Sequence, residues 1–161
     1  MNKISQYSST LELTKGFLIA LLSSCFIYLH YWQFSHPLIN TFLGITTLYL
    51  LLQEGRKVWF FAGTFIGLLW FWWIAMSLEH YGHIWGIPVE ILVISMIYGS
   101  LFWIFAWSAE KLSYRLSLPS VFFKSLFLFI FSYVHPFGFD WFKPELMFIE
   151  SYLGIQKWQF A

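Results

Sequence analysis

The sequence is poor in charged residues and contains a single cysteine. Charged residues make up 11% of its 161 residues, against about 25% in a typical soluble domain, so the chain lacks the polar surface that a soluble globule needs. Cys25 has no second cysteine to pair with, which excludes an internal disulfide and a zinc site built on cysteines. The nine Lys and Arg residues occur singly or in pairs and form no phosphate-binding stripe, so we predict no nucleic-acid partner.

The sequence also lacks the motifs of soluble catalytic domains. It has no Gly-x-Ser-x-Gly, no glycine loop for phosphate binding and no cysteine–histidine pair within plausible reach, so we predict no catalytic residue and no cofactor. Residues 1–16 are too long and too polar a stretch for a signal peptide, and no small-residue cleavage site follows the first apolar run. We therefore expect that run to remain as a membrane anchor.

Apolar and aromatic side chains are abundant, at 59% and 24% of the residues. A helix needs roughly 20 mostly apolar residues to cross a bilayer core about 30 Å thick. Five runs approach this length and are apolar on every face, which favours helices over alternating strands. We predict an all-α integral membrane fold with about five transmembrane helices, over residues 16–34, 38–52, 58–78, 88–108 and 119–134. The second run is short for a full crossing.

The basic residues of the loops alternate along the chain, which predicts the orientation. They are Lys3, Lys15, Arg56, Lys57, Lys111 and Arg115, whereas residues 35–37 and 79–87 contain no Lys or Arg. Loops rich in Lys and Arg stay in the cytoplasm, so we predict a cytoplasmic N-terminus. We expect Lys124 to snorkel to the same side. The predicted segments are a cytoplasmic segment at 1–15, a transmembrane bundle at 16–135, and an outer interfacial segment at 136–161 leading toward a further helix.

Glu79, His80 and His83 form the one cluster with metal-binding residue types. Two histidines three apart can share a helical face, and the carboxylate could complete a site. Tyr81-Gly82 predicts a turn that would break this spacing, and the fourth ligand has no clear source, so we predict no metal site. A membrane enzyme or metal carrier using these three residues and His135 remains an alternative.

Three other residue patterns have a structural and a functional interpretation. Glu90 lies in a membrane run, where an ionisable residue suggests function. We prefer the structural interpretation, in which Glu90 lies in the first turn of a helix and the helix dipole stabilises its carboxylate. Gly63 and Gly67 form a Gly-x-x-x-Gly pair, for which we predict packing inside the bundle rather than dimerisation. We expect His30 to pair with a carbonyl rather than to shuttle protons.

Residues 63–112 resemble a known family. They read G-T-F-I-G-L-L-W-F-W-W-I-A-M-S-L-E-H-Y-G, then H-I-W-G-I-P, then a helix that ends at Glu110-Lys111-Leu112. Further on come H-P-F-G-F-D-W and P-E-L-M-F-I-E-S-Y-L-G-I. The order and spacing of these aromatic, Gly and Pro residues resemble the N-terminal membrane portion, roughly the first third, of bacterial apolipoprotein N-acyltransferases.

The resemblance implies a role in lipoprotein maturation in the bacterial cytoplasmic (inner) membrane, as a multi-pass protein. The family moves an acyl chain from a phospholipid to the N-terminal cysteine of an apolipoprotein, using Glu, Lys and Cys of a nitrilase-like domain. None of these three can be placed in this chain. We therefore expect a truncated or split membrane domain that is inactive alone, with phospholipid, a nitrilase-like catalytic domain or chain, and apolipoprotein as partners. The alternative is a small non-enzymatic membrane scaffold or transport subunit.

Aromatic and polar side chains of the two predicted outer segments are the candidate contact residues. We predict that they touch lipid or a partner, and outward-facing membrane anchors are the alternative role. They are Trp72, Trp73, His80, Tyr81, Trp85, Phe137, Trp141 and Phe142.

Overall fold

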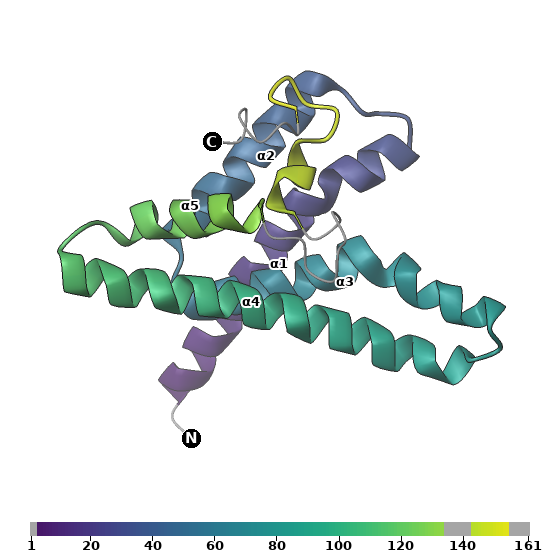
Figure 1. The fold of residues 1–161 in the computed structure, drawn as a ribbon, viewed down its shortest axis with the longest axis horizontal. Helices are drawn as coiled ribbons and strands as arrows, with labels where there is room; N and C mark the ends of the chain where they lie inside the picture. The colour runs from purple at the N-terminus through teal and green to yellow at the C-terminus, as the bar shows by residue number, and fades with distance from the viewer. Residues whose placement is uncertain (1–2, 134–142, 155–161) are drawn as a thin grey trace.

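The computed structural model describes residues 3–133 and 143–154, and within these ranges it contains helices and no strand (Figure 1). Five α-helices follow one another: α1 (Lys3–Tyr31), α2 (Pro37–Gln53), α3 (Arg56–His80), α4 (Ile87–Leu116) and α5 (Ser120–Phe131). Two short 3-10 helices accompany them, η1 (Ile84–Gly86) and η4 (Pro144–Phe148). The predicted all-helical membrane fold with five apolar helices is confirmed in these ranges.

The helices differ in length from the predicted runs. Among the described residues, three stretches are long and apolar enough to cross a membrane, Ser9–Tyr31, Arg56–His80 and Ile84–Leu116, whereas α2 and α5 are shorter apolar helices of 17 and 12 residues. α1 begins at Lys3, before the apolar run, and α4 continues through Lys111 and Arg115. Polar and charged residues such as Glu, Lys and Arg are good helix formers, so a helix can outlast its apolar stretch.

The α3–α4 pair forms the centre of the bundle, and the two helices lie side by side along their length in Figure 1. Glycines permit this close approach. A Cβ added to Gly63 would lie 2.8 Å from Phe102 side-chain atoms, and one added to Gly67 would lie 2.9 Å from the Ser95 Cα. Small residues at such contacts let membrane helices approach closely. The predicted packing role of the Gly-x-x-x-Gly pair inside the bundle is confirmed.

The core is aromatic and includes a few hydrogen-bonded polar groups. Trp59 and Tyr98 are fully buried between the helices, and Phe102 is nearly so. The Trp70 indole Nε1 donates to the Ser24 hydroxyl at 3.0 Å, which joins α3 to α1. A buried Tyr or Trp polar group normally finds a partner of this kind, because an unpaired donor in an apolar interior is costly.

Residues 143–154 return to the bundle after α5. Within η4, Met147 and Phe148 are buried, and the Phe148 ring lies against Gly44 of α2, where an added Cβ would be 2.5 Å away. Figure 1 shows this yellow segment next to α1 and α2. The gap filled by Phe148 explains why a residue without a side chain is needed at position 44. The predicted boundary of an outer segment at residue 136 lies outside the described residues and stays a prediction.

Candidate functional site

The turn between α3 and α4 presents the first group of predicted contact residues. Tyr81 and Trp85 are 75% and 93% exposed, and His80 is exposed beside them at the end of α3. Gly82 has a φ of +73°, a backbone conformation that glycine adopts without strain, and this reverses the chain between the helices. A long aromatic side chain that remains so exposed is positioned to meet lipid or another protein.

Trp72 and Trp73 extend this surface along α3, where they are 47% and 49% exposed. The Trp73 indole Nε1 donates to the Trp70 carbonyl at 2.9 Å. The structure thus brings five of the eight predicted contact residues to the surface of one helical hairpin, and contact with lipid or a partner stays a prediction. The other three, Phe137, Trp141 and Phe142, lie outside the described residues.

The candidate metal cluster does not form in the part of the chain that the structure describes. Glu79, His80 and His83 are all exposed around the turn, and no three His, Cys, Asp or Glu side chains of residues 3–133 and 143–154 are grouped to hold a metal ion. Helix α3 ends at His80, so His83 leaves the helical face that the three-residue spacing requires. His135 is not among the described residues. Glu90 lies in the first turn of α4, as the helix-dipole interpretation predicts.

A polar hollow of about 870 Å³ lies where α1 meets α2 and residues 150–152. His30 Nδ1 is 2.8 Å from Glu150 Oε1, and the Ser35 hydroxyl donates to the other carboxylate oxygen. The hydrogen bond from Ser35 and the nearby imidazole hold the pKa of Glu150 below its usual range, because both stabilise the charged carboxylate. The expectation that His30 pairs with a carbonyl is wrong, since its side chain extends from the end of α1 to meet a carboxylate that follows η4.

Two ionisable residues that the sequence analysis did not single out are buried around η4. Glu145 is 3% exposed and Lys143 is 8% exposed. A charged residue inside a membrane protein is rare and marks a functional or structural site. The signal was present in the sequence, since Lys143-Pro144-Glu145 is a charged group within an aromatic stretch. The prolines and aromatic residues of the same stretch predict a segment at the membrane surface, and that prediction gives no reason to expect buried charges.

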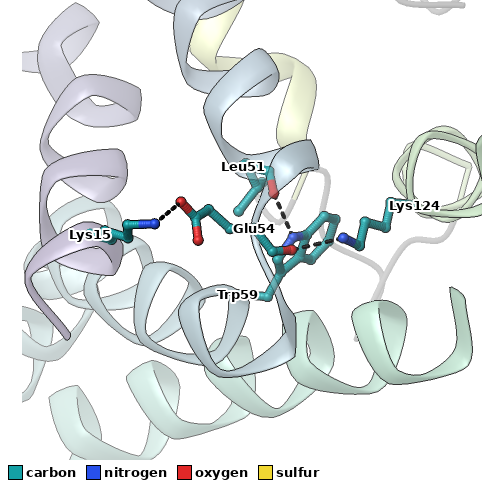
Figure 2. Close-up of polar contacts among 5 residues, drawn as sticks. All are labelled: Lys15, Leu51, Glu54, Trp59 and Lys124. Carbon is teal, nitrogen blue, oxygen red and sulfur yellow. Dashed lines mark hydrogen bonds and ion pairs between the residues drawn. The ribbon is translucent and has the colours of Figure 1, made fainter. Parts of the chain in front are cut away.

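At the end of the bundle where α2 ends and α3 begins, polar contacts join four helices (Figure 2). The Trp59 indole Nε1 donates to the Leu51 carbonyl at 2.7 Å. The Lys124 ammonium donates to the Glu54 carbonyl at 2.7 Å and to the Leu52 carbonyl at 3.2 Å. The Leu51 and Leu52 carbonyls belong to the last turn of α2 and the Glu54 carbonyl to its C-cap residue, where carbonyls lack the regular intrahelical donors, although the Leu51 carbonyl also accepts from the Glu54 backbone N–H at 3.2 Å. The side chains of α3 and α5 therefore cap α2.

The Lys124 side chain does not snorkel to the membrane surface as expected. It is 3% exposed, and Figure 2 shows its ammonium directed at the end of α2 rather than away from the bundle. The Leu52 and Glu54 carbonyls lie within hydrogen-bonding distance of the Lys124 ammonium, so they replace water as its acceptors.

Ion pairs surround the same end. Lys15 Nζ lies 2.6 Å from Glu54 Oε1, and Lys57 Nζ lies 3.2 Å from Glu12 Oε2. The Arg56 backbone N–H donates to Glu110 Oε1 at 3.1 Å. We call this the charged end of the bundle, defined by Glu12, Lys15, Glu54, Arg56, Lys57, Glu110 and Lys124. It brings together Lys15, Arg56 and Lys57, three of the six basic loop residues from which the orientation is predicted.

Comparison with known proteins is consistent with this architecture. Residues 10–161 match the family model of the apolipoprotein N-acyltransferase integral membrane domain. The chain is 36% identical over 142 residues to the apolipoprotein N-acyltransferase of Wolinella succinogenes, covering 88% of this chain and 32% of the relative. It is 35% identical over 161 residues to that of Campylobacter jejuni, covering 95% of this chain and 34% of the relative.

A third relative, the apolipoprotein N-acyltransferase of Helicobacter hepaticus, is 35% identical over 125 residues, which is 78% of this chain and 29% of the relative. No solved structure matches the chain. The chain thus spans about a third of the length of the curated relatives it matches. On the evidence of the matching residues and the helical membrane fold, the chain belongs to the apolipoprotein N-acyltransferase family, within the integral membrane domain.

Proposed function

We propose that this chain is a multi-pass membrane domain of the bacterial cytoplasmic membrane that serves phospholipid-dependent N-acylation of apolipoproteins. In this proposal it holds a nitrilase-like catalytic domain or chain at the outer face and gives phospholipid and apolipoprotein a way in from the side. The observation that carries the proposal is the match of residues 10–161 to the family's integral membrane domain. The exposed aromatic turn at Tyr81 and Trp85 supports a contact surface at one end of the bundle.

The proposed orientation has the N-terminus and the charged end in the cytoplasm. Lys15, Lys57 and Lys124 lie at this end, and basic residues favour the cytoplasmic side. Labelling of single cysteines in intact cells tests it, with Cys25 replaced by alanine. We expect a membrane-impermeant maleimide to label Trp85→Cys but to label Tyr114→Cys only after the membrane is opened. Tyr114 is a matched control because it is also 93% exposed. The reverse pattern would refute this orientation.

We further propose that the chain alone transfers no acyl group, since none of its residues match the Glu, Lys and Cys that the family uses for catalysis. The test combines the purified chain, phospholipid vesicles and a diacylglyceryl lipopeptide, with mass spectrometry of the lipopeptide amine. The expected result is no N-acylated product without an added nitrilase-like domain, and recovery of product when a matching domain is supplied. An N-acylated product from the chain alone would overturn the proposal.

A further inference from the structure

A groove of about 580 Å³ opens on the side of the bundle, next to the charged end. Ser9 and Glu12 of α1 form one wall, and α4 forms the other with Ser100, Trp103 and Ile104. Its floor is made by α3, through Lys57, Phe60 and Phe61. The volume lies within the range of about 300–1,000 Å³ typical of small-molecule sites.

The lining changes character along the groove. Lys57 Nζ lies 3.2 and 3.3 Å from the two carboxylate oxygens of Glu12, so a matched positive and negative charge mark one end. Deeper along α3 the walls become aromatic, with Phe60 and Phe61 packed edge to face at 5.6 Å. The groove therefore has a charged mouth and an apolar interior. A phospholipid has the same order of polarity, from its charged headgroup to its apolar acyl chains.

The position of the groove in the helices agrees with this order. Glu12 lies in the first turn of the stretch Ser9–Tyr31 that is long enough to span a membrane, and Lys57 lies in the first turn of α3. On α4, Trp103 stacks on Trp107 with ring centroids 6.0 Å apart, and Lys111 lies 5.0 Å from the Trp107 ring centroid. Tryptophan and lysine near helix ends are typical of the membrane–water interface. The charged mouth is thus at headgroup level and the aromatic interior at acyl-chain level.

We propose that this groove binds one zwitterionic aminophospholipid of the leaflet at the charged end. Its phosphate binds Lys57, its primary ammonium donates to Glu12, and one acyl chain lies along Phe60, Phe61 and Trp103. The charges select this occupant. The charges of Lys57 and Glu12 sum to zero. Their side chains are 66% and 25% exposed, so each can contact a part of the lipid headgroup that carries the opposite charge. An anionic headgroup would satisfy Lys57 but would place its charge beside the Glu12 carboxylate.

The site lies at the opposite end of the bundle from the aromatic turn at 79–87. It is therefore distinct from the lipid access suggested under the proposed function, and failure of either proposal leaves the other standing. A lipid held between α1, α3 and α4 would fill a lateral opening that the described side chains leave, and so tie the first helix to the central pair.

Native mass spectrometry of the purified chain in detergent micelles tests the site. The probes are phosphatidylethanolamine, phosphatidylcholine and phosphatidylglycerol of equal chain length at equal concentration. We expect one phosphatidylethanolamine to be retained about tenfold better than either competitor, as one additional charge-assisted hydrogen bond allows. Phosphatidylcholine tests the ammonium contact, because a quaternary ammonium has no N–H to donate. Equal retention of the three lipids, or preference for the anionic one, would overturn the proposal.

Variants separate the headgroup contact from the groove itself. Ser100→Trp fills the groove without changing charge and is expected to remove the bound lipid. Combined Lys57→Gln and Glu12→Gln should keep a lipid but lose the preference for phosphatidylethanolamine. Lys111→Gln is the control, since it removes a lysine outside the groove and should change neither. If Ser100→Trp retains lipid as the wild type does, the proposed occupant is wrong.

Discussion

Replacing Lys124 by methionine tests whether the capped end of α2 stabilises the bundle. The Lys124 ammonium is the donor to two carbonyls, those of Leu52 and Glu54, at 3.2 and 2.7 Å. Methionine has a similar length and no donor, so the substitution removes both hydrogen bonds while largely retaining the packing of the side chain. The result is two carbonyls at the end of α2, both in partly buried contacts, that lose their donor, which costs free energy.

The expected loss follows from the nature of the two bonds. A hydrogen bond to a charged group contributes about 1.5–3 kcal/mol, and part of the loss is offset because a buried ammonium is no longer desolvated. We therefore expect Lys124→Met to lower the free energy of unfolding by about 2–4 kcal/mol. Trp59→Phe removes one neutral hydrogen bond, from the indole to the Leu51 carbonyl, and should cost less.

The assay is unfolding of the purified chain in mixed micelles with increasing sodium dodecyl sulfate, followed by tryptophan fluorescence and circular dichroism. Lys111→Met is the matched control, because Lys111 is exposed on α4 and its contact with the Trp107 ring at 5.0 Å is a cation–π interaction, worth about 0.5–1 kcal/mol at an exposed site. If Lys124→Met destabilises the protein no more than Lys111→Met, the capping argument is wrong.

Three further predictions address separate parts of the fold. Gly99→Ala places a Cβ 2.1 Å from the Thr64 hydroxyl oxygen and should cost about 1–3 kcal/mol in the same unfolding assay, whereas Gly55→Ala, whose Cβ meets its nearest atom at 3.9 Å, should be nearly neutral. The lowered pKa of Glu150 means that its carboxylate stabilises the attachment of residues 150–154 above its usual pKa, and this contribution is lost as the pH falls through the lowered pKa. Proteolysis of that segment should therefore accelerate as the pH falls below the ordinary pKa of a glutamate, about 4.3, and Glu150→Gln should remove the dependence; a wild-type rate that stays flat as the pH falls would contradict it. Trp85→Ala should change the unfolding free energy by less than about 0.5 kcal/mol, as its 93% exposure implies, and a larger loss would mean that Trp85 packs on the bundle.

The helices could be predicted from the sequence because membrane helices are defined by composition over long windows. The runs at 58–78 and 88–108 lie inside α3 and α4, and the small-residue pair in α3 correctly predicted close packing. The ends could not be predicted in the same way. Hydropathy reports where a chain prefers lipid, whereas a helix continues until its backbone is broken, as at Ser117, which has a φ of +52° before Leu118-Pro119.

Charged side chains were harder to place than helices. Tyr81 and Trp85 are exposed at the turn between α3 and α4, and their predicted contact with lipid or a partner stays a prediction. Lys124 and Glu145 required knowledge of what lies opposite them in space. The ammonium of Lys124 meets the end of α2, 70 residues away in sequence from Glu54, and no local pattern reports such a partner.

The two ends of the bundle differ in whether their exposed side chains have partners within the protein. At the charged end, helix termini are joined by ion pairs and by the capping of α2, so α1, α2, α3 and α5 are held by groups whose charges are matched within the protein. At the 79–87 turn, Trp85 and Tyr81 stand out from the helices and bury little of their own surface. An exposed aromatic surface gains free energy only by meeting lipid or a partner, and it can do so without loss of fold when the bundle is fixed elsewhere. A bundle that is fixed at the charged end leaves the turn at 79–87 free to serve as the contact surface proposed above.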